Sequence, residues 1–325
     1  MSTNGYPQPS GAFEGNLFEA LDETGLDDPR PRHRYWLHAL LFLLTLLSTT
    51  VVGAGFAQSF ALNLPSSFDG DLYGYVRMWR QPSFLLQGLP FSLTLLTILM
   101  AHEMGHFLTA RYYGVDVSLP YFLPAPTLIG TMGAFIRFRS AIFSKRALFD
   151  IGIAGPLAGF VVLLAPLVVG LALSRVSPGA VHHSDLVFGS PLLLQLFERI
   201  AFPGARPEDI YLHPVARAAW VGMLATALNL LPIGQLDGGH ILYAFAGEKT
   251  RWLSRFFVVL LIPMGLYFKT YSWLLWAVLL FFFAMRHPVI YDPYPIGRAR
   301  TWLGVAALII LILTFTLSPV RTNGL

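Results

Sequence analysis

Seven segments of the chain are runs of apolar residues that hold no Asp, Glu, Lys or Arg. They cover residues 36–62, 81–101, 151–174, 218–236, 256–268, 270–285 and 301–320. A helix needs about 20 apolar residues to cross the roughly 30 Å hydrocarbon core of a bilayer. The pattern therefore predicts an all-α polytopic membrane protein with about seven transmembrane segments.

The fifth and sixth segments are shorter than an ordinary span and are separated by one charged residue, Lys269. A lysine between two apolar runs can extend its ammonium group toward water while its aliphatic stem stays on apolar surface. The pattern favours two spans joined by a tight turn. It leaves open a single longer, kinked element over 251–286.

Residues 115–140, between the second and third segments, do not have the pattern of a helix. The stretch contains Pro120, Pro124, Pro126 and Gly130, and side chains at its two ends alternate as they do in strands. Backbone without helical hydrogen bonds is tolerated at membrane depth only where protein or a cavity satisfies it. We expect a β-hairpin that re-enters the membrane; a loop packed on helix ends is the alternative.

Composition supports a membrane protein and excludes several other classes. Of the residues, 55% are hydrophobic and 12% are charged, whereas soluble domains carry about 25% charged residues. Cysteine is absent, which excludes disulfides, thiolate metal ligands and cysteine nucleophiles. The net charge of +4 comes without a basic run interleaved with aromatic residues, so no nucleic-acid partner is expected.

The charges outside the apolar segments predict how the chain lies in the bilayer. Residues 1–34 are polar and rich in Gly, Pro and acidic residues, which is typical of a disordered tail. If this tail is cytoplasmic and the spans alternate, 14 of the 22 Lys and Arg residues fall on the cytoplasmic side, in agreement with the positive-inside rule. We expect a cytoplasmic N-terminus, the lipid bilayer as a partner and a bacterial inner membrane as the location.

The second apolar segment leads into the motif His102-Glu103-Met104-Gly105-His106. Residues four apart lie on one face of a helix, so both imidazoles can reach one metal ion. Two histidines in this spacing, with a glutamate as general base beside the first, are the pattern of zinc proteases. The alternative is a pair of histidines that pack polar groups against neighbouring helices. Ionisable groups at the end of a charge-free span are costly and favour the functional interpretation.

A zinc site of this kind needs a third protein ligand and an open position. When the acidic residues are sorted by location, only Glu103 and Asp237 remain at the predicted spans. Asp237 lies near the inner end of the fourth segment, at about the depth of His102 and His106, and a buried carboxylate there is costly without a cation. We therefore predict Asp237 as the third ligand. His240 is an alternative ligand, or a histidine that supports the site from outside.

Two motifs together make the chain resemble a known family. The motif His102-Glu103-Met104-Gly105-His106, with Asn229-x-x-Pro232-x-x-x-x-Asp237-Gly238 on a later span, resembles the site-2 protease family of intramembrane zinc metalloproteases. The resemblance covers roughly residues 84–250 and is strongest to a branch that lacks a PDZ domain.

Two further segments of the chain resemble parts of the same family. The run Gly155-Pro156-Leu157-Ala158-Gly159 resembles its glycine-rich middle helix, in which small residues allow close helix contact. The run Gly133-Ala134-Phe135-Ile136-Arg137-Phe138 resembles its re-entrant β-element. We expect this second run to bind substrate.

The resemblance implies a division of the chain. The expected parts are a disordered cytoplasmic tail at 1–34, a first span with an outer loop at 35–83, and a catalytic core at 84–250 that includes the hairpin at about 115–140. C-terminal spans follow at 251–325.

The resemblance also implies roles for the motif residues. His102, His106 and Asp237 would hold Zn2+, Glu103 would act as general base, and Asn229 would stabilise the oxyanion. The implied activity is proteolysis within or near transmembrane segments of membrane-protein substrates, at a site nearer the cytoplasmic face. The alternative is a divalent-metal carrier or membrane chaperone that uses the same His and Asp cluster. The sequence makes no prediction of the oligomeric state.

Overall fold

The computed structural model describes residues 34–64, 76, 81–178, 186–283, 292 and 294–322 of the 325-residue chain. The chain divides into two compact units, Met1–Leu37 and His38–Leu325. The contacts described below all lie within the second unit. The tail predicted at 1–34 lies, apart from Arg34, outside the described residues.

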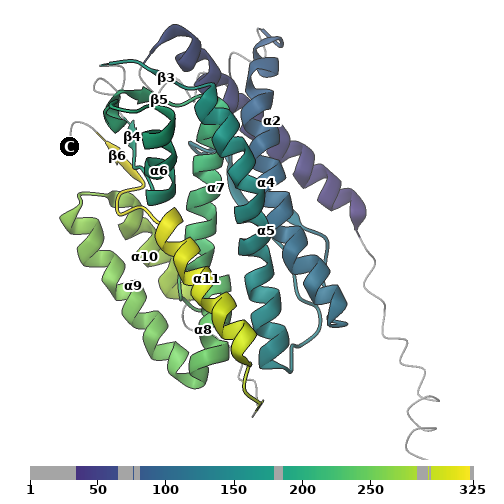
Figure 1. The fold of residues 1–325 in the computed structure, drawn as a ribbon. Coiled ribbons are helices and arrows are strands. Elements are labelled where there is room, and N and C mark those ends of the chain that lie inside the picture. Colours follow the sequence, from purple (N-terminus) through teal and green to yellow (C-terminus); the bar gives the residue numbers. More distant parts are fainter. Residues whose placement is uncertain are drawn as a thin grey trace, which may run out of the picture. The chain divides into compact units, whose positions relative to one another are not determined.

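The described residues are mostly helical, as predicted (Figure 1). Three of the predicted spans form long helices: α2 is Tyr35–Leu62, α4 is Phe84–Tyr112 and α5 is Lys145–Ala172. In the part of the chain that the structure describes, these three helices are long and apolar enough to cross a membrane.

The other four predicted spans form shorter helices, so the prediction of seven spans stays a prediction. The fourth segment is interrupted: α7 ends at Leu230 and α8 begins at Asp237. The fifth and sixth segments form two helices around a turn in which Lys269 has a φ of 50°. The shorter helices are α6 (Leu192–Ala201), α7 (Pro214–Leu230), α8 (Asp237–Ala246), α9 (Thr250–Tyr267), α10 (Tyr271–Phe283) and α11 (Arg298–Thr314), with 3-10 turns η1 (Pro207–Asp209) and η2 (Gly247–Lys249).

Short strands pair antiparallel at three places in the described residues. The pair β1–β2 lies where the sequence predicted a hairpin, and the pairs β3–β5 and β4–β6 lie in segments for which no strand was predicted. The strands are β1 (Tyr121–Pro124), β2 (Thr131–Phe135), β3 (Arg175–Val176), β4 (Leu186–Phe188), β5 (Ile210–Tyr211) and β6 (Val320–Thr322). In the hairpin, Tyr121 lies opposite Phe135, Phe122 opposite Ala134, and an isolated bridge joins Val117 to Phe138.

Helix α2 holds the hairpin at two points. The Ser48 hydroxyl donates a hydrogen bond of 2.6 Å to the Gly130 carbonyl in the hairpin loop. Near the other end of the hairpin, Nδ1 of His38 donates to the Pro120 carbonyl at 3.1 Å, and the His38 ring lies 4.0 Å from the ring of Tyr121. The hairpin is therefore packed against a long helix along its length rather than standing in solvent.

Helices α4, α5 and α7 approach one another closely and form the centre of the molecule (Figure 1). A Cβ atom added at Gly105 on α4 would lie 2.5 Å from the Ala154 carbonyl oxygen on α5. A Cβ atom at Gly170 on α5 would lie 2.3 Å from the backbone nitrogen of Ala216 on α7. These glycines allow backbone-to-backbone contact, and the contact brings the motif residues of three helices within reach of one another.

An ion pair fixes α11 to this centre near one end of α5. The Arg300 guanidinium contacts both carboxylate oxygens of Asp150, at 2.6 Å and 2.8 Å. The hydroxyl of Tyr113, which follows α4, donates to the same carboxylate at 2.5 Å. Three segments far apart in the sequence are thus joined at one end of the bundle.

Candidate metal centre

Helix α4 carries the first three residues of the site. His102 and His106 lie one turn apart on the face that α5 covers, and Glu103 follows His102. All three residues are buried: His102 is 5% exposed, His106 is 6% exposed and Glu103 is 4% exposed. Burying three ionisable groups in an apolar bundle costs free energy unless they bind one another or a shared ion.

The break between α7 and α8 delivers the fourth residue, Asp237. Helix α7 ends because Leu231, which precedes Pro232, adopts an extended conformation with a ψ of 133°. Helix α8 then starts at Asp237, where the helix N-terminus favours a carboxylate. Gly238 allows this start to lie against the end of α7, since a Cβ atom there would stand 2.1 Å from the Leu230 carbonyl oxygen.

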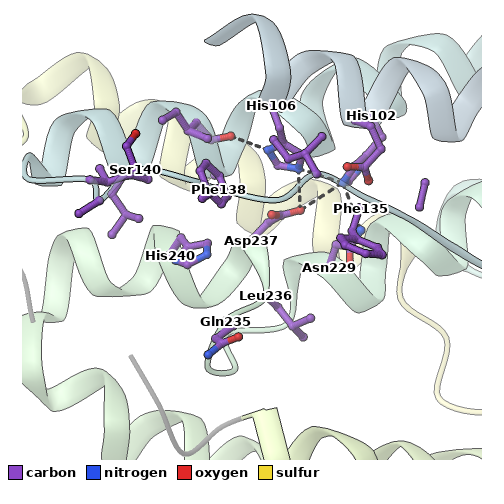
Figure 2. Close-up of a pocket in the computed structure, with 18 of the residues that line it drawn as sticks. His102, His106, Phe135, Phe138, Ser140, Asn229, Gln235, Leu236, Asp237 and His240 are labelled. Atoms are coloured by element: carbon purple, nitrogen blue, oxygen red, sulfur yellow. Dashed lines mark hydrogen bonds and ion pairs between the residues drawn. The ribbon is translucent and has the colours of Figure 1, made fainter. Parts of the chain in front are cut away.

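Three atoms that could donate an electron pair to a metal ion, hereafter the donor atoms, converge on one point (Figure 2). The Nε2 atoms of His102 and His106 lie 3.2 Å apart, and each lies 3.2 Å from Oδ2 of Asp237. His102, His106 and Asp237 are the group that could hold a metal ion in the described part of the chain. The structure thus brings together the three residues that the sequence predicted as ligands.

Helix α5 supports both imidazoles with its glycine face. Nδ1 of His106 donates a hydrogen bond of 2.7 Å to the Ile151 carbonyl, which leaves the Nε2 lone pair directed at Asp237 and His102. A Cβ atom added at Gly155 would lie 2.1 Å from Nε2 of His106, and one at Gly159 would lie 3.2 Å from Cβ of His102. The ring of His106 therefore occupies the space that any side chain at position 155 would need.

Asn229, at the end of α7, reaches the same group. Its side-chain nitrogen lies 3.1 Å from Nε2 of His102. The sequence resemblance implied a role for Asn229 at the site, and the structure places its amide beside the converging donor atoms (Figure 2).

The hairpin covers the open side of this group and forms a cavity with it. The cavity has a volume of about 640 Å³, and Glu103, Ala134, Phe135, Ile136 and Phe138 are among its lining residues. The backbone N–H of Ile136 faces the Glu103 carboxylate. The substrate-binding run predicted at 133–138 therefore contributes four residues to the cavity wall, whereas Gly133 and Arg137 are not among the lining residues.

Other lining residues were not predicted from the sequence. They include Gln235, Leu236 and Gly152. His240, which the sequence predicted as an alternative ligand, also belongs to the wall but lies outside the group of three donor atoms (Figure 2). The carbonyl of Ile151 had no sequence signal, because every residue carries a carbonyl group. The glycines at 155 and 159 did have a signal, but their spacing predicted helix packing rather than room for an imidazole ring.

Comparisons with known proteins match the part of the chain that carries this group of residues. The model of Peptidase family M50 matches residues 90–269. This range includes the residues for which the sequence predicted roles at the site, namely His102, Glu103, His106, Asn229 and Asp237. The chain is 36% identical to the probable chloroplastic zinc metalloprotease EGY1 of Oryza sativa subsp. japonica, over 72% of this chain and 41% of the rice protein. It is 30% identical to the Arabidopsis thaliana protein of the same name, over 95% of this chain and 58% of that protein.

The chain is also similar to a solved structure, the site-2 protease from Methanocaldococcus jannaschii. The match covers 63% of this chain and 82% of that chain, with 18% sequence identity and a TM-score of 0.37. The chain spans about half the length of the two plant relatives. It is an integral membrane protein, and by the extent of the family match it belongs to Peptidase family M50.

Proposed function

We propose that the chain is a zinc metalloprotease that cleaves membrane proteins within or near their transmembrane segments. The observation that carries the proposal is that Nε2 of His102, Nε2 of His106 and Oδ2 of Asp237 lie 3.2 Å from one another. The buried carboxylate of Glu103 belongs to the residue that follows His102. The printed names of the two plant relatives, probable zinc metalloproteases, support the same activity.

The donor set fits zinc. Zinc binds imidazole nitrogen and carboxylate oxygen at about 2.0–2.1 Å, so neighbouring donors of a tetrahedral site lie about 3.3 Å apart. The three donor separations of 3.2 Å match that spacing. Three protein ligands leave the fourth position free, as in catalytic rather than structural zinc sites.

The residues around the donors suit hydrolysis of a peptide bond. A zinc ion held there would acidify a water molecule to a pKa near 7 and polarise the scissile carbonyl. Glu103 would accept the proton of that water and deliver it to the leaving amine. The Asn229 amide, 3.1 Å from Nε2 of His102, is close enough to donate a hydrogen bond to the developing oxyanion.

The hairpin is suited to hold an extended substrate beside Glu103. In an antiparallel pair, the backbone groups of successive residues point alternately toward and away from the partner strand. The backbone N–H of Ser118 donates to the Arg137 carbonyl, and that of Arg139 donates to the Asp116 carbonyl, so the backbone groups of odd-numbered residues here face the first arm of the hairpin. The groups of Ala134, Ile136 and Phe138 then face the cavity, where a substrate strand could pair with them.

The proposed membrane arrangement rests on the apolar segments and the distribution of Lys and Arg residues along the chain. We propose about seven spans, a cytoplasmic N-terminus, and a hairpin that re-enters the membrane between α4 and α5. The site then lies nearer the cytoplasmic face, and the catalytic core extends over 84–250. A bacterial inner membrane remains our proposed location, although the plant relatives are named as chloroplast proteins.

The proposed substrates are membrane proteins with a transmembrane segment. A divalent-metal carrier would need ionisable groups spaced along a path through the bundle. In the described residues, the groups that could hold a metal gather at one point and no second cluster continues from it. The carrier and chaperone alternatives are therefore not favoured.

The first prediction concerns zinc content. The purified full-length protein should carry about one zinc ion per chain, and His102→Ala, His106→Ala and Asp237→Ala should each lose it, because each removes one of three ligands. Metal analysis by mass spectrometry measures this. His240→Ala is the control and should retain zinc; retention of zinc by the Asp237 variant would remove that residue from the ligand set.

The second prediction concerns Glu103. Glu103→Gln should keep zinc and the fold but cleave about 10²–10⁴-fold more slowly, because an amide cannot accept the water proton. The measurement is cleavage, in proteoliposomes, of a membrane protein that co-purifies with the Glu103→Gln variant. Glu248→Gln, a change at an exposed carboxylate, is the control. Turnover near wild type in Glu103→Gln would contradict the proposed mechanism.

The third prediction concerns the glycine face of α5. Gly155→Ala should weaken zinc affinity about 10–100-fold, the usual size of effects from groups that support a ligand, because the new methyl group would displace the His106 ring. Competition with a chelator of known affinity measures the change. Gly159→Ala should have a smaller effect, since its nearest contact is longer; equal zinc affinity in wild type and Gly155→Ala would show that His106 does not need this space.

The fourth prediction concerns substrate pairing with the hairpin. In a series of substrates with single N-methyl amides at successive positions beside the cleaved bond, cleavage should fall at every second position. The reason is that only alternate amides of a paired strand donate to the neighbouring strand. Uniform sensitivity along the series, or none, would mean that the substrate does not add to the β2 edge.

A further inference from the structure

A second cavity lies away from the metal centre. It has a volume of about 260 Å³ and is lined by residues of β4, η1, β5, α6, the first half of α7, the later part of α2 and the hairpin loop. Arg217 of this cavity and Asn229 of the metal centre are both on α7, about three turns or about 18 Å apart along its axis. The cavity is thus a separate feature from the site described above.

Among the described residues, the buried carboxylate of Glu198 in this cavity has no counter-ion. Helix α6 turns Leu193, Leu194 and Glu198 inward, and Glu198 is 3% exposed. Its Oε2 atom has no hydrogen-bond partner and the carboxylate forms no ion pair within the described residues. A buried carboxylate in this condition is strongly disfavoured unless a cation or a proton joins it.

Arg217, Tyr211 and Glu208, which also line the cavity, each contact a group other than Glu198. The Arg217 guanidinium carbon lies 5.0 Å from the ring centre of Phe56 and 5.1 Å from that of Phe188. The Tyr211 hydroxyl donates to the Leu64 carbonyl at 2.6 Å. Glu208 is half exposed at the rim, 3.8 Å from Arg206. Apart from Ser190, the rest of the wall is apolar and aromatic, and it includes Leu128 and Ile129 of the hairpin loop.

We propose that this cavity binds a small organic cation, an ammonium group on an apolar or aromatic body, with the Glu198 carboxylate as its counter-ion. An ammonium group donates hydrogen bonds, and its positive charge would balance the negative charge of the Glu198 carboxylate. The aromatic and aliphatic wall suits the body of such a ligand. The two carboxylates, Glu198 and Glu208, outnumber the one arginine in the lining, so the cavity favours a cation over an anion.

This site also predicts how binding depends on pH. Burial raises the pKa of Glu198 to about 7, and the other charged or titratable groups lining the cavity are Glu208, Tyr211 and Arg217. The cation needs the ionised carboxylate. Binding should therefore be strongest above pH 7 and weaken as the pH falls and Glu198 takes up a proton.

The test uses 2-phenylethylammonium as the cation and 2-phenylethanol as its neutral counterpart. Full-length protein in nanodiscs of zwitterionic lipid is titrated with each at pH 8 and pH 6. Wild type should bind the ammonium compound saturably at pH 8, about tenfold or more tightly than the alcohol, because the alcohol forms no charged hydrogen bond. The difference should shrink at pH 6.

Two variants complete the test. Glu198→Gln should lose the preference for the ammonium compound, and Glu208→Gln, at the exposed rim, should keep it. Thermal unfolding of Glu198→Gln checks its fold, while the comparison of two ligands on wild type needs no variant. Equal affinity for the two compounds in wild type, equal ammonium affinity in Glu198→Gln, or no saturable ammonium binding would overturn the proposal.

Discussion

The structure depends on how two imidazoles and a carboxylate are held together inside an apolar bundle. His102, His106 and Asp237 come from two helices that are distant in sequence, and each donor atom lies 3.2 Å from the other two. Separately, each group would be costly to bury. Directed at one point, they form a site in which a single cation can offset the burial of all three.

The three side chains are held together mainly by features of the backbone around them: glycines, a carbonyl group and a break between two helices. Glycine at 155 leaves room for the His106 ring, and the Ile151 carbonyl fixes the orientation of that ring. Pro232 ends α7 so that Asp237 can start a new helix at the depth of the histidines. These features explain why helices approach closely around the metal centre, next to a core of large side chains that includes Phe91, Leu163 and Met223.

The sequence predicted the long helices, and the convergence of His102, His106 and Asp237, because their signals are local or chemical. The apolar segments 36–62, 81–101 and 151–174, which form most of α2, α4 and α5, contain no Asp, Glu, Lys or Arg. The spacing of His102 and His106 is a helical repeat. Asp237 could be identified because so few acidic residues lie near the apolar segments. The strands β4 and β6 could not be predicted, because they are three residues each and pair across more than a hundred residues of chain. The buried Glu198 was also missed, since it is an ordinary acidic residue of α6 until the fold encloses it.

The measurement that tests the central claim most directly is X-ray absorption at the zinc K-edge of the purified protein. The account predicts four nitrogen or oxygen ligands at about 2.0–2.1 Å, with the outer-shell scattering of two imidazole rings per zinc ion. A six-coordinate oxygen shell, or a spectrum without imidazole scattering, would contradict the assignment of His102 and His106 as ligands.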